Sequence, residues 1–135
     1  MKVILFGGTG MVGQGALREA LLDPRVEKVL SVVRTPSGRS DPKLEEVALG
    51  DLARIETIAP KLAGYDAVIY ALGVSAVGMD EAAYRKVTYD LALKIANAIL
   101  PAPKTVFIFI SGTGTDSSAK GRVMWARVKG ETENA

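Results

Sequence analysis

Residues 5–14 read Leu5-Phe6-Gly7-Gly8-Thr9-Gly10-Met11-Val12-Gly13-Gln14. The segment 2–6, which runs into these glycines, is short, apolar and partly β-branched, so it predicts a buried strand. The segment 11–22, which follows them, places its apolar residues on one side of a helix that Asp23-Pro24 ends. The glycines therefore form the turn between a strand and a helix.

The rest of the chain repeats this alternation of strands and helices. Because the expected strands are apolar without alternation, they predict a parallel sheet covered by helices on both faces. We therefore expect an α/β fold over residues 1–135 as one domain, a doubly wound parallel sheet of about five strands in three αβα layers. We expect further strands at 26–33, 44–49, 65–72 and 105–110, and helices at 51–62, 80–100 and 122–135. The helix at 80–100 is expected to end at Pro101 and Pro103, and its apolar stripe is Tyr84, Val87, Leu91, Ile95 and Ile99.

The glycine turn fits two overlapping motifs. Gly8, Gly10 and Gly13 form G-x-G-x-x-G, whereas Gly7, Gly10 and Gly13 form G-x-x-G-x-x-G. Between a strand and a helix, such a motif is typical of dinucleotide binding. The first glycine allows the tight turn, the second lets the backbone approach a pyrophosphate, and the third lets the helix pack on the strand. An ATP-type P-loop fits less well, because Gln14-Gly15 stands where Lys-Ser/Thr is needed.

The end of the second strand bears on which dinucleotide binds. An NAD site places an acidic residue there to bind the ribose 2′-hydroxyl. This chain instead has Arg34, with Arg39 in the following loop, and the acid Asp23 precedes the strand at its wrong end. A guanidinium suits a 2′-phosphate through paired hydrogen bonds. We therefore expect NADP rather than NAD; the alternative is that both arginines are solvated loop charges.

Composition excludes several kinds of chemistry. The 135-residue chain has no cysteine and no histidine, which excludes disulfides, thiolate nucleophiles, histidine bases and metal sites built from either residue. Its net charge of +2, from 17 basic and 15 acidic residues, gives no electrostatic case for nucleic acid. No segment approaches the roughly 20 apolar residues of a membrane span, and no targeting signal is visible. We therefore expect a cytoplasmic protein without a metal, a nucleic-acid partner or a membrane segment.

Four segments carry a family resemblance in their order along the chain. They are Gly7-Gly8-Thr9-Gly10-Met11-Val12-Gly13, Gly50-Asp51-Leu52, Ala71-Leu72-Gly73 and Trp125-Ala126-Arg127-Val128-Lys129. With them the chain resembles the short-chain dehydrogenase/reductases, in the extended or atypical branch of sugar-nucleotide epimerases, NmrA-like proteins and Tat-interacting-protein-like oxidoreductases. The resemblance covers nearly the whole chain, and it implies a Rossmann fold with a bound nicotinamide dinucleotide.

The resemblance also implies roles in cofactor binding. Asp51 and Leu52 would contact the adenine, and Ala71 and Gly73 would line the cofactor beyond the fourth strand. The whole expected cofactor-binding set is Gly7, Gly8, Thr9, Gly10, Met11, Val12, Gly13, Arg34, Arg39, Asp51, Leu52, Ala71, Leu72, Gly73 and Lys129.

For catalysis the resemblance implies Ser111, Thr113 and Lys129. Ser111 or Thr113 would hydrogen-bond a substrate carbonyl, and Lys129 would be the lysine of the Tyr-x-x-x-Lys pair, bound to the nicotinamide ribose. The chain departs from the family here, because Trp125 occupies the tyrosine position, on the same helix face as Lys129. An indole N–H only donates a hydrogen bond and cannot exchange a proton with a carbonyl oxygen. Trp125 is alternatively a packing aromatic, and the alternative donors are the tyrosines of the helix at 80–100, Tyr84 and Tyr89.

Members of the resembled family continue with a sixth strand and a substrate-binding lobe. Because residues 131–135 still belong to the last expected helix, we expect this chain to be the cofactor domain without that lobe, as a fragment or a minimal form. The strand at 105–110 would then be an unprotected apolar edge, where we expect weak solubility or self-association into a homo-oligomer.

Three functions follow from these features. The favoured one is an NADP(H)-binding domain of an oxidoreductase or epimerase that acts on a carbonyl or sugar-like small-molecule substrate, which the sequence does not identify. The second is a non-catalytic NADP(H)-sensing module of the NmrA-like kind, which Trp125 favours because it replaces the proton donor. The third, an S-adenosylmethionine methyltransferase, is disfavoured because Arg34 replaces the acid wanted for ribose hydroxyls.

Overall fold

The computed structural model describes residues 1–100 and 104–135. Its centre is a five-stranded parallel sheet in the order β3-β2-β1-β4-β5. The doubly wound α/β fold predicted from the sequence is confirmed, and the strand order reverses between β1 and β4. The strands are β1 (Lys2–Phe6), β2 (Lys28–Val33), β3 (Leu44–Ala48), β4 (Ala67–Tyr70) and β5 (Val106–Phe109).

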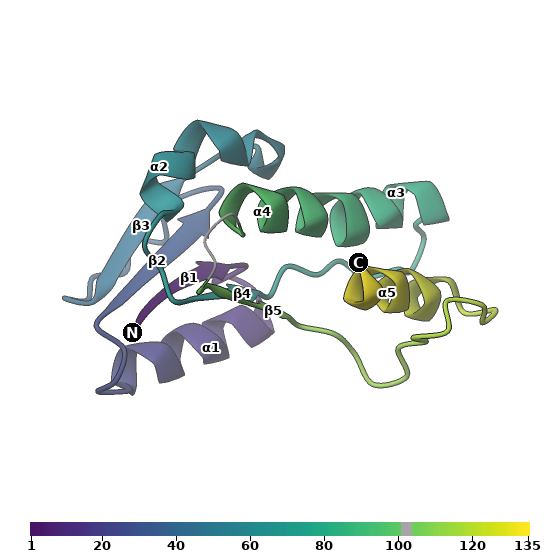
Figure 1. The fold of residues 1–135 in the computed structure, drawn as a ribbon, viewed down its shortest axis with the longest axis horizontal. Helices are drawn as coiled ribbons and strands as arrows, with labels where there is room; N and C mark the ends of the chain where they lie inside the picture. The colour runs from purple at the N-terminus through teal and green to yellow at the C-terminus, as the bar shows by residue number, and fades with distance from the viewer. Residues whose placement is uncertain (101–103) are drawn as a thin grey trace.

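Helices cover both faces of the sheet, which completes the three layers (Figure 1). On one face, Leu17 and Leu21 of α1 pack against β1 and β2. On the other face, Ile55 of η1 and Ile95 of α4 belong to the larger core cluster. Figure 1 shows α5 alongside α3, and the two helices are in contact. The bounds are α1 (Met11–Leu22), η1 (Leu52–Ile58), α2 (Ala59–Leu62), α3 (Glu81–Arg85), α4 (Leu91–Ile99) and α5 (Met124–Asn134).

The segment predicted as one helix at 80–100 is divided into three parts. Between α3 and α4 lies a π-helical turn, η2 (Lys86–Asp90). Of the predicted apolar stripe, Tyr84, Ile95 and Ile99 are buried, whereas Val87 within the π turn and Leu91 directly after it are only half-buried. A wider turn changes the angular phase of the helix, so a stripe spaced by three and four residues does not stay in the core throughout. Pro101 and Pro103, expected to end this helix, lie outside the described residues.

β5 lies at the edge of the sheet, as the sequence predicts. Phe107 and Phe109 point to the face that holds the larger core cluster. On the opposite face, Val106 is 59% exposed and Ile108 is 42% exposed, because the core cluster beneath α1 reaches β1, β2 and β4 but not β5. This apolar edge strand is therefore only half covered, and the self-association expected from it stays a prediction.

Candidate functional site

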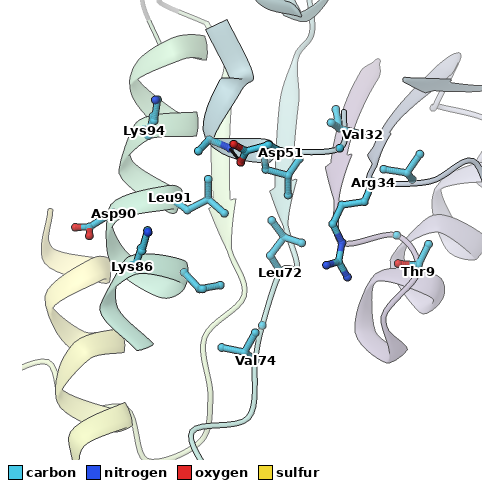
Figure 2. A pocket seen from close by; sticks show the side chains of 18 residues that line it. Thr9, Val32, Arg34, Asp51, Leu72, Val74, Lys86, Asp90, Leu91 and Lys94 are labelled. Carbon is cyan, nitrogen blue, oxygen red and sulfur yellow. Dashed lines mark hydrogen bonds between the residues drawn. The ribbon is translucent and has the colours of Figure 1, made fainter. Parts of the chain in front are cut away.

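A cavity of about 610 Å³ opens at the carboxyl end of the sheet, where the strand order reverses between β1 and β4. This reversal is where open α/β sheets bind their ligands. Figure 2 shows the α3–α4 helix on one side of the cavity and Arg34 and Thr9 on the other. Its lining comprises Gly7, Gly8, Thr9, Val32, Val33, Arg34, Gly50, Asp51, Leu52, Ala53, Leu72, Gly73, Val74, Lys86, Val87, Asp90, Leu91 and Lys94.

The glycine turn between β1 and α1 is tightly packed on one side and open on the other. Gly7 has φ of +86°, and a β-carbon there would lie 2.6 Å from the carbonyl oxygen of Ala71. A β-carbon at Gly13 would lie 1.9 Å from the carbonyl oxygen of Gly7, so this glycine lets α1 approach β1. Gly10, whose N–H donates to the Gly7 carbonyl at 3.0 Å, has its nearest obstacle at 3.5 Å. The geometry favours the register G-x-x-G-x-x-G, with Gly7 as the turn residue and Gly10 facing open space.

The first turn of α1 has backbone donors to offer to an anion. Gly10 is the N-cap of this 12-residue helix, and no side chain caps its N-terminus. The first N–H groups of a helix have no partner within the helix, and its dipole favours negative charge there. Met11 and Val12, predicted as cofactor contacts, are exposed beside this turn but do not line the cavity.

Arg34 follows β2 directly and lines the cavity from the side of the glycine turn. Figure 2 shows its side chain extending between Thr9 and Leu72. Arg34 is exposed, and within residues 1–100 and 104–135 it forms no ion pair. Its guanidinium is therefore available to an anionic group in the cavity.

A second cavity, of about 270 Å³, lies behind the glycine turn and holds Arg39. Glu46 projects into it and accepts two hydrogen bonds from Ser37, at 3.0 Å from the backbone N–H and 2.6 Å from the hydroxyl. Ser31 on β2 also lines it, and its buried hydroxyl has no partner among the described residues. The full lining is Gly8, Thr9, Gln14, Leu17, Ser31, Val33, Ser37, Arg39 and Glu46.

The loop after β3 closes the end of the first cavity. Asp51 accepts a hydrogen bond from the N–H of Ala53 at 2.9 Å and so caps η1. This cap holds Leu52, which is half-buried, at the cavity wall. Across from it lie Leu72 and Gly73, which follow β4. The structure therefore brings four residues predicted from separate motifs to one cavity.

The helix wall of the cavity was not predicted from the sequence. Lys86, Val87, Asp90, Leu91 and Lys94 all line the cavity. Val87 and Leu91 belong to the predicted apolar stripe of the helix at 80–100, and the three charged residues carry no prediction. The available signal was topological, because the helix that follows β4 must pass beside the point where the strand order reverses.

The candidate catalytic residues lie apart from the two cavities. Ser111 shares a hydrogen bond of 2.8 Å with the hydroxyl of Thr115, and Thr113 is exposed. Lys129 donates to the carbonyl of Ile110 at 3.5 Å, and burial lowers the pKa of its ammonium while Glu133 partly offsets this shift. None of Ser111, Thr113 and Lys129 lines either cavity.

Trp125 and Lys129 face the same loop after β5, as their spacing predicts. A β-carbon at Gly112 would lie 3.7 Å from the Trp125 ring and 3.8 Å from the Lys129 ammonium. The alternative tyrosines are placed otherwise: Tyr84 is buried, and the Tyr89 ring lies 4.7 Å from the Arg85 guanidinium carbon. Neither Tyr84 nor Tyr89 lines either of these two cavities.

Comparisons with known proteins agree with a nucleotide site. A family described as NAD(P)H-binding matches residues 7–132. The chain is 33% identical to the mitochondrial protein fmp52 of Emericella nidulans, over 98% of this chain and 58% of that protein. It is 31% identical to the photosystem II assembly factor Ycf39 of Synechocystis, over 82% of this chain and 33% of that protein. The chain thus spans little more than half the length of the first of these curated relatives and a third of the second.

Solved structures show the same fold at low sequence identity. Uronate dehydrogenase from Agrobacterium tumefaciens superposes with a TM-score of 0.74 at 19% identity, over 98% of this chain and 53% of that one. The oxidoreductase ylbE from Lactococcus lactis superposes with a TM-score of 0.77 at 22% identity, over 98% and 61%. The family resemblance predicted from the sequence is confirmed, and the methyltransferase interpretation has no support.

The comparisons correct the expected location. The cytoplasmic assignment rested on the absence of a visible targeting signal, and it is contradicted because relatives such as Aspergillus terreus fmp52-2 and Emericella nidulans fmp52 are named as mitochondrial proteins. Targeting is read by receptors from features that differ between organelles, so a short apolar N-terminus is a weak criterion. No helix in the described part of the chain is long and apolar enough to cross a membrane.

Proposed function

Because its match spans residues 7–132, the chain belongs to the NAD(P)H-binding family, and we propose that it is the NADP(H)-binding domain of an oxidoreductase or epimerase. The observation that carries this proposal is the 610 Å³ cavity between the open side of the glycine turn and the α3–α4 helix. Residues 1–135 form this domain, and its substrate would be a small carbonyl or sugar-like molecule. The activity of the whole protein belongs to this proposal, since the curated relatives are longer.

The residues of the site fit a dinucleotide. The uncapped N-terminus of α1 would bind the pyrophosphate, and Gly10 leaves the space that a pyrophosphate needs. Asp51 and Leu52 would hold the adenine end, and Leu72 and Gly73 would flank the cofactor along β4. The assignments of the adenine and of the β4 side rest on the cavity lining and the cap of η1, and that of the pyrophosphate rests on the open N-terminus of α1 beside the cavity.

The second cavity supports a preference for NADP over NAD. Arg34 and Arg39 flank the position beyond β2 where the adenosine ribose would lie, one in each cavity. The unpartnered hydroxyl of Ser31 is a further polar group at the same place. The negative charge of Glu46 would repel a phosphate there, but its carboxylate already accepts two hydrogen bonds from Ser37. The two guanidinium groups outnumber the one carboxylate at this position, so its net positive charge favours the extra phosphate of NADP.

Catalysis would use the loop after β5. When bound, NADPH supplies a hydride. Ser111 or Thr113 would orient a substrate carbonyl, and Lys129 would bind the nicotinamide ribose. Trp125 cannot supply the proton, since its indole only donates a hydrogen bond. This favours a second function, an NADP(H)-sensing module that binds the cofactor without turnover.

The test is calorimetric titration of the chain with NADPH and NADH, followed by an absorbance assay of NADPH oxidation with small carbonyls and quinones. We expect saturable binding with NADPH tighter than NADH. Turnover that disappears in Lys129→Ala supports the enzyme, whereas binding without turnover is expected both of the sensor and of a cofactor domain that lacks a substrate lobe. Absence of binding to either dinucleotide contradicts both.

A further inference from the structure

Tyr70 at the end of β4 is a buried tyrosine with a single polar contact. Its side chain is fully buried, with the rings of Phe6, Phe107 and Phe109 at centroid distances of 6.3, 6.0 and 5.9 Å. Its hydroxyl lies 3.1 Å from the carbonyl oxygen of Val87 in the π turn and donates to it. Burial raises the pKa of the Tyr70 hydroxyl, so this group stays protonated and remains a donor.

The carbonyl that Tyr70 reaches is the one that the π turn displaces. In a regular α-helix the N–H of Leu91 would bond to the carbonyl of Val87, four residues earlier. Here it bonds to the carbonyl of Lys86, five residues earlier. The hydroxyl of Tyr70 therefore donates to the acceptor that loses its α-helical partner. A buried carbonyl without any partner would be costly, so this contact stabilises the π turn against the α form.

The π turn sets the angular phase between two fixed helices. α3 is tied to α5 by the ion pairs Arg85–Glu131 and Arg127–Glu81, and α4 is held in the core by Ile95. Neither helix can rotate freely, so the turn between them determines how their faces align.

The aligned faces form one wall of the first cavity. The change from α-helical to π-helical hydrogen bonding falls between Val87 and Leu91. Lys86 and Val87 before it, and Leu91 and Lys94 after it, all line the cavity. In a regular α-helix, Lys94 would be rotated about 80° from Lys86 around the helix axis. The π turn changes this rotation, because it lies between the two parts of the wall, and it therefore sets the angle at which they meet. Figure 2 shows this wall opposite Arg34.

We propose that Tyr70 is a positioning residue of the nucleotide site, whose hydroxyl holds the π turn that aligns the Lys86–Lys94 wall with the cavity. The ligand in this statement rests on the proposed function. Tyr70 itself lines neither cavity, so it acts through the backbone of Val87.

The variant Tyr70→Phe tests this, because it removes the hydroxyl and keeps the packed ring. We expect faster amide exchange at Leu91, altered backbone chemical shifts over residues 86–92, and NADPH binding about fivefold weaker or more. The matched control is Tyr65→Phe, a buried tyrosine of the same core cluster at the amino end of β4, which should change none of these. Replacement of Tyr70 by p-aminophenylalanine restores a donor at the same place and should restore the native values.

Each outcome decides the proposal. If Tyr70→Phe folds with unchanged exchange at Leu91, or with a changed turn and unchanged affinity, the proposal is overturned. If Tyr70→Phe does not fold, the p-aminophenylalanine protein decides: native exchange and affinity support the proposal, and a folded protein with weak binding overturns it. If the unmutated chain binds no dinucleotide, the proposed function fails, while the exchange measurement still shows whether Tyr70 holds the turn.

Discussion

Gly13 lies so close to Gly7 that a β-carbon on Gly13 would be 1.9 Å from the carbonyl oxygen of Gly7. At Gly10, three residues earlier in the same motif, the nearest atom to a β-carbon would be 3.5 Å away. One glycine of the motif is thus required by the packing of α1, whereas the other leaves space that the protein itself does not use. A substitution at Gly13 should therefore affect folding, and a substitution at Gly10 should affect ligand binding.

Two substitutions in this motif should therefore have opposite effects. Gly13→Ala should lower the free energy of unfolding by about 1–3 kcal/mol, because the methyl group overlaps backbone that cannot withdraw. Gly10→Val should keep the fold, since Gly10 has an extended backbone that valine adopts readily, but it should abolish dinucleotide binding. Thermal melts by circular dichroism report the fold, and titration reports the ligand. A folded Gly10→Val protein that still binds NADPH would place the cofactor elsewhere.

Arg34→Ala should discriminate between the two dinucleotides. Loss of a paired contact to the 2′-phosphate should weaken NADPH about tenfold or more and leave NADH nearly unchanged. The control is Arg54→Ala, an exposed arginine of η1 that lines neither cavity. Calorimetry of both ligands with both variants makes the comparison. Equal affinities for NADPH and NADH in the unmutated chain would contradict the preference itself.

Glu46→Gln should act in the reverse direction. Glu46 brings a negative charge into the second cavity and engages Ser37, so removal of the charge should tighten NADPH a few-fold and spare NADH. Glu45→Gln is the matched control on the same strand, because Glu45 pairs with Lys28 and lies outside the cavity. If both glutamine variants bind NADPH alike, the 2′-phosphate does not occupy the second cavity.

The start of the fold could be predicted because its signals are local. The glycines and Asp23-Pro24 bracket α1, and the strand and helix bounds at 2–6 and 11–22 match those of the structure. The π turn could not be predicted in this way. Its hydrogen bond joins Tyr70 to Val87, 17 residues apart, and no local spacing encodes that contact.

The same distinction applies to the site. Residues on turns that follow strands, such as Gly7, Arg34 and Leu72, could be found by counting from strand ends, and all three line the cavity. The opposite wall at Lys86 and Lys94 depends on how a helix crosses the sheet, which is a tertiary property. Those lysines carried no sequence signal beyond a charged helix face.

Lys129 should make the free energy of unfolding depend on pH in the alkaline range. Burial lowers the pKa of this ammonium in the folded chain, so above that pKa the unfolded chain binds more protons than the folded one. The free energy of unfolding should therefore rise as pH increases from the folded pKa to that of an ordinary lysine. Lys129→Met should raise the melting temperature at neutral pH and remove this rise, whereas Lys120→Met, at an exposed site, should do neither. A flat alkaline profile in the unmutated chain would mean that Lys129 stays hydrated.

Trp125 offers an optical test of whether the loop after β5 belongs to the nucleotide site. It is the only tryptophan, so its emission reports one place in the chain. Its ring lies against Gly112 and Gly114, and Lys129, one helical turn later, faces the same loop. If Lys129 binds the nicotinamide ribose, NADPH lies near this ring and absorbs where indole emits. Quenching of Trp125 and sensitised NADPH emission should then saturate together.

The alternative is that Trp125 serves in packing or in a subunit contact. Its emission would then follow protein concentration instead of ligand, so dilution without NADPH is the control for the titration. Lys129→Ala should weaken NADPH and shift the quenching curve to higher concentration, because the ribose contact is lost, while the ring keeps its contacts at Gly112. If calorimetry shows saturable NADPH binding while the emission of Trp125 stays unchanged, α5 does not belong to the nucleotide site. The assignment of Ser111, Thr113 and Lys129 to catalysis would fall with it, since all three depend on the nicotinamide reaching this loop.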